Sequence, residues 1–323
     1  MDLKGKKFLV IGGAGFIGSH VVTELLKEDV DEVIVFDNFA RGKITNLSEQ
    51  LVDPRCTLFD AGGDVREVDI LNKAMKGIDG VFHLAAMWLL HCKDFPRTAF
   101  DVNVQGTFNV LEACVNHKVE RLVYSSSASV YGDAVEVPMT EEHPFNNKNF
   151  YGATKIAGEA MARAFHDRYG MNYVGLRYMN VYGPHQDQTA AYTGVIPIML
   201  NKIDANETPE INGDGSQAYD FITAQDAAKC NILAMKSEIS DEFYNVGTGV
   251  QTSIKDLCEL ILELKKSNLE VKYKPYSNED MRRMVQNRIG CPEKAKRDLG
   301  FEHETDLEKG LENLITWRNK KYE

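Results

Sequence analysis

The sequence predicts an α/β fold in which a doubly wound parallel sheet is followed by a smaller C-terminal α/β lobe. Strand and helix signals alternate from residue 7 to about residue 177, and the strand candidates are short, continuous apolar runs. A glycine-rich stretch joins the first of these strands to the first helix. Continuous apolar strands separated by helices are typical of a parallel sheet that helices cover on both faces.

The first part of the chain provides the sheet and most of the helices that cover it. The expected strands are residues 7–11, 33–36, 56–59, 80–84, 121–124 and 173–177. Helical patterns lie between the strands, at residues 16–27, 70–75, 99–116 and 151–169. We therefore expect residues 1–177 to form the first domain.

After residue 177 the pattern changes. Turn sequences occur at 182–184 and 212–215. Helices are expected at 196–202, 224–236, 254–265 and 307–319, and short strands at 243–246 and 270–273. We expect residues 178–323 to form a second lobe that binds substrate, with some chain returning to the first domain. Ligands of such sheets bind at the carboxyl ends of the strands, so the cleft is expected between the two parts.

Composition limits the class of protein. The chain has 323 residues, of which 43% are hydrophobic and 26% charged, as in ordinary globular proteins. Its net charge of −11 argues against binding nucleic acid or an anionic membrane through bulk charge. We expect no secretory signal and no membrane span, because the first strand begins early and no apolar run is long enough. The six cysteines form no C-x-x-C pair and indicate reduced thiols of a cytoplasmic protein. No metal site is expected.

The glycine-rich stretch predicts a dinucleotide site. Gly13, Gly15 and Gly18 fit the spacing G-x-G-x-x-G, whereas Gly12, Gly15 and Gly18 fit a wider spacing similar to that of short-chain dehydrogenases. Backbone without Cβ atoms lets a pyrophosphate approach closely, and the N-terminus of the following helix favours its charge. The expected binding residues are Gly12, Gly13, Gly15, Phe16, Ile17 and Gly18. The fold is then of the Rossmann type.

The acidic residue at the end of the second strand indicates which dinucleotide is bound. Asp37 lies where a carboxylate accepts hydrogen bonds from an adenosine ribose. A carboxylate would repel the 2′-phosphate of NADP, and Asn38 rather than an arginine follows it. We therefore expect the cofactor to be NAD.

A tyrosine, a lysine and a serine form the candidate catalytic group. Tyr151 and Lys155 are four residues apart in a predicted helix, so their side chains share one face. An ammonium beside a phenol favours the phenolate, which can exchange a proton with substrate near neutral pH. Ser127 follows an expected strand, where its hydroxyl would point into the cleft and bind the same substrate oxygen.

Further motifs accompany these residues along the chain. In order they are the turn at 12–18, Asp37-Asn38, GDVR at 63–66, HLAA at 83–86, NVQGT at 103–107, 125–132, YGATK at 151–155, NVYGP at 180–184 and GDGSQ at 213–217. In this order the sequence resembles the extended short-chain dehydrogenase/reductases. Within them it resembles the NAD-dependent sugar-nucleotide epimerase/dehydratase family, and most of all its UDP-glucose 4-epimerase branch.

The resemblance implies roles for matching residues. Asp64 and Val65 would flank the adenine, and Asn38 would lie beside the ribose-binding Asp37. The far half of the cofactor would be lined by Leu84, Ala85 and Ala86. Asn103 would support Tyr151 and Lys155 from within the fold, and Asn180 would contact the diphosphate of the substrate. The family's helices at 99–116 and 151–169 form a dimer interface, so a homodimer is expected.

The residues after Ser127 separate the reactions of this family. Its 4,6-dehydratases carry an acidic pair there, which removes water from the sugar. This chain has Ala128 and Ser129, which lie where substrate is expected and cannot act as acid or base. The favoured activity is therefore C4 epimerisation of a UDP-hexose, UDP-N-acetylhexosamine or UDP-uronic acid through a transient 4-keto sugar. A reductase, dehydrogenase or dehydratase acting on a nucleotide sugar is the alternative, and a non-catalytic NAD sensor is a remote one.

Several candidate substrate residues depart from the family. Tyr219 replaces an arginine that clamps the diphosphate, and Arg282 and Arg283 either supply the missing charge or form a solvated surface. Arg288 lies near a position that limits sugar size, where a cation would suit an acidic or N-acetylated sugar. Trp88 either packs on the sugar ring or belongs to the core.

Overall fold

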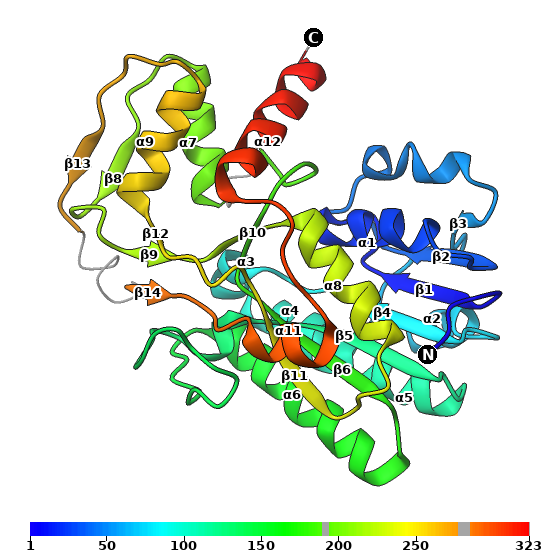
Figure 1. Cartoon of the computed structure of the whole chain (residues 1–323). Coiled ribbons are helices and arrows are strands. Elements are labelled where there is room, and N and C mark those ends of the chain that lie inside the picture. Colours follow the sequence, from blue (N-terminus) through cyan, green and yellow to red (C-terminus); the bar gives the residue numbers. More distant parts are fainter. Residues whose placement is uncertain (189–193, 277–284, 323) are drawn as a thin grey trace.

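A computed structural model of the chain describes residues 1–188, 194–276 and 285–322. Its centre is a seven-stranded sheet whose neighbouring strands all pair in parallel (Figure 1). From one edge to the other the strands are β11 (Glu242–Val246), β6 (Tyr173–Tyr178), β5 (Arg121–Ser127), β4 (Gly80–His83), β1 (Lys7–Ile11), β2 (Glu32–Phe36) and β3 (Cys56–Leu58). The order reverses beside β1, as in doubly wound folds of the Rossmann type. The predicted fold class is therefore confirmed.

Helices cover both faces of this sheet. On one face lie α1 (Phe16–Leu26), α8 (Ala224–Lys236) and α11 (Glu293–Leu299), whose apolar residues share a core with Phe8 and Val10. On the other face lie α2 (Val68–Ala74), α5 (Gly106–Asn116) and α6 (Phe150–Tyr169), which share a core with Leu9 and Ile11. Alternate residues of β1 thus enter opposite cores, as the period of a strand requires.

The second lobe has a third core of its own. Figure 1 shows the helices and short strands that form this lobe. Its helices are α7 (Val195–Asp204), α9 (Ile254–Leu264) and α12 (Leu307–Tyr322). Its strands form three small sheets: β7 (Asn180–Tyr182) with β10 (Phe221–Thr223), β8 (Glu210–Asn212) with β13 (Lys272–Lys274), and β9 (Ala218–Tyr219) between β12 (Thr252–Ser253) and β14 (Asn287–Arg288). The chain beyond residue 177 also returns to the main sheet as β11, α8 and α11.

Two differences from the expected elements matter for the site. Strand β5 continues to Ser127, because its serines pair with residues 176–178 of β6. The helix expected at 99–116 is divided into α4 (Pro96–Ala99), a π-helical turn (Phe100–Gln105) and α5, and a short helix α3 (Leu89–Asp94) precedes it. Short π-helical turns are frequent at functional sites.

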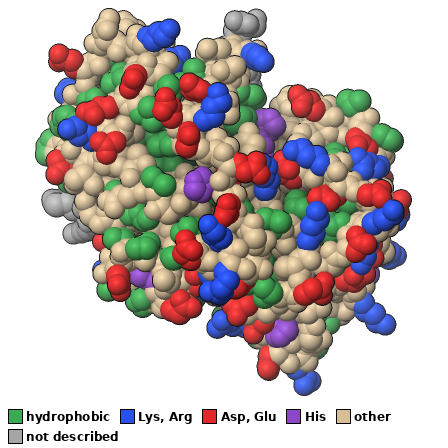
Figure 2. Space-filling view, viewed as in Figure 1, with side chains coloured by type: hydrophobic (Ala, Val, Ile, Leu, Met, Phe, Trp, Pro, Cys, Tyr) green, Lys and Arg blue, Asp and Glu red, His purple; other side chains and the backbone are tan. Residues whose placement is uncertain are grey.

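The surface mixes charges of both signs. On the face shown in Figure 2, acidic and basic side chains are interspersed rather than gathered into a field of one sign. Within the described parts of the chain, no helix has the length and apolarity needed to cross a membrane.

Candidate active site

A cleft of about 720 Å³ lies at the carboxyl ends of the sheet strands. It is bounded by the segments that follow β1, β2, β3, β4 and β5, and by the first turns of α6. Residues of the second lobe complete it, among them Val195 of α7 and Arg288 of β14. The cleft therefore lies between the main sheet and the second lobe, where the sequence predicted it.

The glycine turn packs against neighbouring backbone too closely to accept side chains. Gly12 adopts a φ of +82°, which favours glycine, and a Cβ there would lie 2.8 Å from the backbone nitrogen of Ala85. A Cβ on Gly18 would collide with the carbonyl oxygen of Gly12. Gly15, Phe16, Ile17 and Gly18 line the cleft with Gly12, whereas Gly13 packs against Val10 and Val35. Helix α1 begins at Phe16 without a side-chain cap, so its first N–H groups stay available to an anion.

Asp37 lies at the end of β2 beside this turn. Its carboxylate accepts hydrogen bonds from the backbone N–H groups of Ala14 (3.0 Å) and Phe39 (2.8 Å). Burial raises the pKa of the carboxyl group, although these hydrogen bonds oppose the shift. The carboxylate therefore ties the turn after β1 to the loop after β2, and it lines the cleft where a ribose is expected.

The residues expected around the adenine and the far half of the cofactor also line the cleft. Asn38 donates a hydrogen bond to Asp64 (3.3 Å), and Arg66 holds the same carboxylate, lowering its pKa to about 2. The other lining residues predicted for the cofactor are Val65, Leu84, Ala85 and Ala86. This end of the cleft thus continues from the glycine turn as one surface.

Tyr151, Lys155 and Ser127 meet at the opposite end of the cleft. Asn149 caps α6 by accepting a hydrogen bond from the N–H of Gly152 (2.8 Å), which places Tyr151 in the first turn. The Ser127 side chain lies close enough to the Tyr151 hydroxyl to lower its pKa. The Lys155 ammonium lies 5.8 Å from the centre of the Tyr151 ring and donates to the carbonyl oxygen of Ser125 (2.7 Å). The predicted catalytic group is thus assembled within one site.

Burial shifts the proton affinity of both catalytic candidates. It raises the pKa of Tyr151 to about 12, although the Ser127 side chain opposes the shift. It lowers the pKa of Lys155, whose residue is 5% exposed, to about 8. Both changes favour the neutral form, because a low dielectric disfavours charge. A ligand that brings charge or further hydrogen bonds into the cleft is therefore needed to form the phenolate.

Asn103 supports this group from the π-helical turn. It accepts a hydrogen bond from the N–H of Met87 (2.6 Å) and donates to Thr154 (3.1 Å). Thr154 in turn donates to the carbonyl oxygen of Tyr151 (2.7 Å). Asn103 is buried and does not line the cleft. Its position fits the supporting role implied by the family resemblance rather than direct contact with a ligand.

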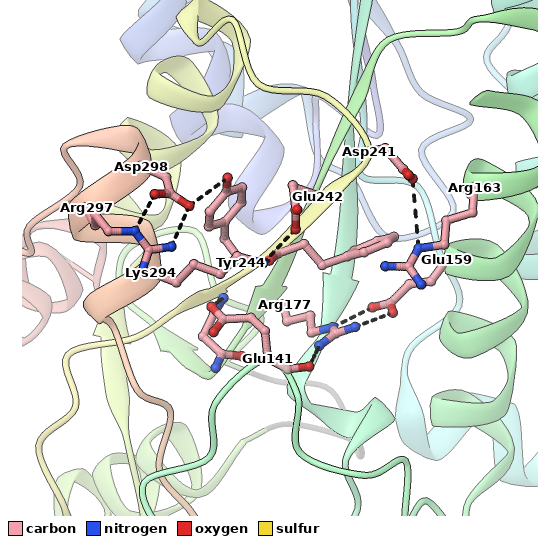
Figure 3. Close-up of polar contacts among 12 residues, drawn as sticks. Glu141, Glu159, Arg163, Arg177, Asp241, Glu242, Tyr244, Lys294, Arg297 and Asp298 are labelled. Atoms are coloured by element: carbon pink, nitrogen blue, oxygen red, sulfur yellow. Dashed lines mark hydrogen bonds and ion pairs between the residues drawn. The ribbon is translucent and has the colours of Figure 1, made fainter. Parts of the chain in front are cut away.

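Behind the catalytic group lies a buried ion pair that the sequence reasoning missed. Arg177 of β6 binds Glu159 of α6 through two hydrogen bonds of 2.9 and 2.7 Å (Figure 3). Ser126 donates to the same carboxylate (2.5 Å), so the pair holds the strand end that carries Ser127. The sequence signal for this ion pair was Arg177, a charged residue at the end of the otherwise apolar strand expected at 173–177.

The residues predicted for the substrate divide into three groups. Ser129, Trp88, Asn180 and Arg288 line the cleft. Ala128 and Tyr219 are not among the residues that line it. Ala128 follows the extended Ser127, begins a 3₁₀ turn (Ala128–Val130) and packs into a separate core with Val130. The Tyr219 hydroxyl donates to the carbonyl of Val285 (2.8 Å). Arg282 and Arg283 lie outside the described residues.

The cleft contains lining residues that were not predicted. The Arg41 guanidinium lies 5.5 Å from the centre of the Trp88 ring, which gives this tryptophan a partner at the cleft wall. His185 binds the Ser19 hydroxyl (2.8 Å) and stacks on His20. The turn at 182–184 was the sequence signal for this segment. No cluster of metal ligands occurs in residues 1–188, 194–276 or 285–322.

Comparisons with known proteins agree with this geometry. A family model described as "NAD dependent epimerase/dehydratase family" matches residues 8–247. A UDP-glucose 4-epimerase of Halalkalibacterium halodurans is 31% identical over 97% of the chain and 95% of its own length. A UDP-N-acetylglucosamine 4-epimerase of Methanobrevibacter ruminantium, solved with UDP-N-acetylmuramic acid, is 32% identical with a TM-score of 0.91, covering 98% of this chain and 99% of its own. A UDP-glucose 4-epimerase of Thermotoga maritima, solved with UDP-glucose, is 32% identical with a TM-score of 0.90, covering 98% and 100%.

Proposed function

Because the chain belongs to the NAD-dependent epimerase/dehydratase family, we propose that it inverts C4 of a hexose carried on a nucleoside diphosphate. The observation that carries this proposal is the meeting of Tyr151, Ser127 and Lys155 at one end of the cleft. Such a group removes a proton from a sugar hydroxyl and later returns it.

The residues present fit NAD. The pyrophosphate would lie against the glycine turn at the uncapped N-terminus of α1, and Asp37 would accept hydrogen bonds from the adenosine ribose. Leu84 and Ala85 would lie against the other half of the cofactor. The chemistry that NAD supplies when bound is the reversible oxidation of C4 to a ketone.

The protein's own residues manage the proton and hold the sugar. Ser127 would donate a hydrogen bond to the C4 oxygen while Tyr151 accepts its proton. Lys155 would stabilise the phenolate through its positive charge, from its fixed position on the Ser125 carbonyl. After the 4-keto sugar turns within the cleft, Tyr151 returns the proton to the oxygen of the inverted carbon. These roles account for the placement of all three side chains.

The distribution of carboxylates favours epimerisation over dehydration. Among the described residues, the acidic side chains that line the cleft are Asp37, Asp64 and Asp187. Asp37 and Asp64 belong to the adenosine end, and Asp187 pairs with Lys43 at 3.9 Å. Within the described parts of the chain, no carboxylate lines the cleft beside Tyr151, whereas removal of water from a sugar needs an additional acid and base.

The experiment that tests this function is incubation of the purified protein with UDP-, GDP- and CDP-sugars, followed by NMR of the products. We expect C4 epimers of a UDP-sugar, formed without added cofactor. UDP is proposed because the relatives named above act on, or are solved with, UDP-sugars. Formation of a stable 4-keto-6-deoxy sugar would instead show a dehydratase. Stoichiometric consumption of added NAD or NADH would show a dehydrogenase or reductase.

We further propose that two copies of the chain associate through α5 and α6. Phe108 of α5 is 42% exposed and Tyr169 of α6 is 58% exposed. Both line a groove of about 320 Å³ between these helices, together with Phe165. Exposed aromatic side chains on adjacent helices are typical of a protein interface. The family's dimers use the corresponding helices.

We propose the cytoplasm as the location of the protein. All six cysteines carry free thiols, and five of them are buried. Free buried thiols are typical of proteins from reducing compartments.

A further inference from the structure

Arg288 is a cation in the cleft that has no anionic partner among the described residues. Its Nε is buried, and its N–H donates no hydrogen bond to any of them. The structure records no side-chain hydrogen bond or ion pair between this guanidinium and any described residue. Two other buried arginines, Arg177 and Arg318, bind the carboxylates of Glu159 and Asp204 at 2.7 and 2.8 Å. An arginine in a cleft without such a partner indicates that a ligand supplies the anion.

The backbone of Arg288 is held firmly in place. Strand β14 pairs in parallel with β9, and the carbonyl oxygen of Arg288 accepts a hydrogen bond from the N–H of Asp220 (3.0 Å). The next residue, Ile289, accepts a hydrogen bond from Met139 (2.8 Å). Asp133 is a carboxylate whose charge acts on Arg288. It accepts hydrogen bonds from the backbone of residues 286 and 287 rather than from the guanidinium. The guanidinium is thus presented to the cleft by a fixed strand rather than by a free loop.

Arg288 belongs to the end of the cleft where the chemistry occurs. It lines the same cleft as Tyr151 and Ser127, and its charge acts on Tyr151. The carboxylates that line the cleft among the described residues lie elsewhere, beside the adenosine site or beside Lys43. The anion that Arg288 needs must therefore come from the part of the ligand near the reacting carbon.

We propose that the preferred substrate carries a carboxylate on its hexose, and that Arg288 binds this group. The inference rests on the proposed function, which places C4 of the sugar at Tyr151. In a hexuronic acid the carboxylate is attached to C5, next to C4, whereas the diphosphate is attached to C1 across the ring. A guanidinium beside Tyr151 thus faces the carboxylate side of the sugar. Arginine binds a carboxylate through two parallel hydrogen bonds, which gives both affinity and orientation.

The test compares UDP-glucuronate with UDP-glucose, using the wild-type protein and Arg288→Met. We expect wild type to have the higher kcat/KM for UDP-glucuronate. Loss of the charged hydrogen bonds in R288M should lower kcat/KM for UDP-glucuronate by about 10- to 100-fold. The value for UDP-glucose should change by less than about 3-fold. Arg297→Met, which removes an exposed arginine far from the cleft, serves as the matched control and should change neither value.

Each other outcome overturns the carboxylate assignment in a recognisable way. If R288M lowers kcat/KM equally for UDP-glucuronate and UDP-glucose and also weakens the binding of UDP itself, Arg288 binds the diphosphate. A wild-type protein that epimerises UDP-glucose and rejects UDP-glucuronate would refute the acidic substrate but leave the epimerase function standing. Absence of turnover with every sugar nucleotide would refute the proposed function itself. Since the wild-type comparison needs no variant, poor folding of R288M would not prevent a decision.

Discussion

Burial disfavours the charged forms of both Lys155 and Tyr151. The ammonium donates to the carbonyl of Ser125 and lies beside the rings of Tyr124 and Tyr151, with little access to water. The phenol has Ser127 beside it. A small charge brought by a ligand then has a large effect, because the low dielectric that opposes ionisation also strengthens every interaction of the charge.

Tyr151→Phe should abolish turnover while leaving NAD binding nearly unchanged. The variant keeps the ring that packs at the cleft wall and loses only the hydroxyl that exchanges the proton. General acid–base catalysis contributes about 10²- to 10⁴-fold, and we expect a loss of at least about 10³-fold. Turnover is measured by NMR, and bound NAD by absorbance after denaturation. Tyr169→Phe on the same helix is the control. Loss of NAD together with activity would show that Tyr151 is structural.

Lys155→Met should alter how stability depends on pH. The folded-state pKa of Lys155 is about 8, below the pKa of 10.5 of a free lysine. Below pH 8 the folded state holds an unfavourable buried charge, and this cost fades as pH rises toward 10.5. The stability of K155M relative to wild type should therefore be about 2 kcal/mol smaller at pH 9.5 than at pH 7. Urea unfolding at both pH values measures this difference. A difference that does not change with pH would contradict the burial of a charged lysine.

Asp37→Ala should weaken the preference for NAD over NADP. The carboxylate lies where the ribose is expected, and its removal takes away both a hydrogen-bond acceptor for NAD and the repulsion of a 2′-phosphate. Titration of both cofactors by fluorescence gives the ratio of their dissociation constants. Unchanged selectivity would refute the ribose role. The exposed Asp2→Ala provides a charge-matched control.

The π-helical turn between α4 and α5 is the element that links the loop after β4 to the catalytic helix. Its Asn103 bonds to Met87 on one side and Thr154 on the other. Periodicity predicted one unbroken helix over 99–116, whereas the structure widens residues 100–105 into a π-helical turn. Only the tertiary partners of Asn103 show why the turn widens there.

Asn103→Ala should lower both stability and activity. The variant leaves the N–H of Met87 without its partner, which costs about 1–3 kcal/mol for a buried group, and leaves the Met87 carbonyl with the Cys92 thiol as its donor. It also frees Thr154, so the first turn of α6 becomes less precisely placed and kcat should fall about 10-fold or more. Urea unfolding and steady-state kinetics measure the two effects. The exposed Asn268→Ala should change neither, and a normal kcat in N103A would show that the turn does not position Tyr151.

Long elements were predicted well because their pattern repeats. Helix α8 has the expected bounds, and the expected strands are all present within about one residue except β5 and the strand placed at 270–273. Short elements such as α3, α11 and β14 were missed, since so few residues show no period and tertiary contacts decide them. Tyr151, Lys155 and Ser127 lie together because helical spacing and a strand end place them at one end of the cleft. Ala128 packs into a core because the turn after Ser127 directs its side chain there, which the sequence pattern does not show.

The chain beyond residue 177 contributes to both lobes that bound the cleft. Strand β11 pairs with β6, and α8 packs against α1 on the sheet face. The helices α7, α9 and α12 instead share a separate core. Association of two copies through α5 and α6 would leave the cleft open, because the groove between these helices shares no lining residue with it.

Phe108→Asp should convert a dimer into monomers. A buried charge at an apolar interface is strongly unfavourable, so sedimentation should give the 36.3 kDa of one chain in place of twice that mass. Val52→Asp, at an 81% exposed position in a different part of the surface, is the control and should remain dimeric. A wild-type protein that sediments as a single chain would refute the dimer.

The late arrival of β11 has a consequence for biosynthesis. The ribosome synthesises β6 about 70 residues before β11, the strand that pairs with its outer edge, because β6 begins at residue 173 and β11 at residue 242. During that interval the nascent chain presents an unpaired row of N–H and C=O groups, which is a template for aggregation. Chains truncated before residue 242 should therefore precipitate or recruit chaperones, whereas in the full-length chain β11 pairs with that edge of β6.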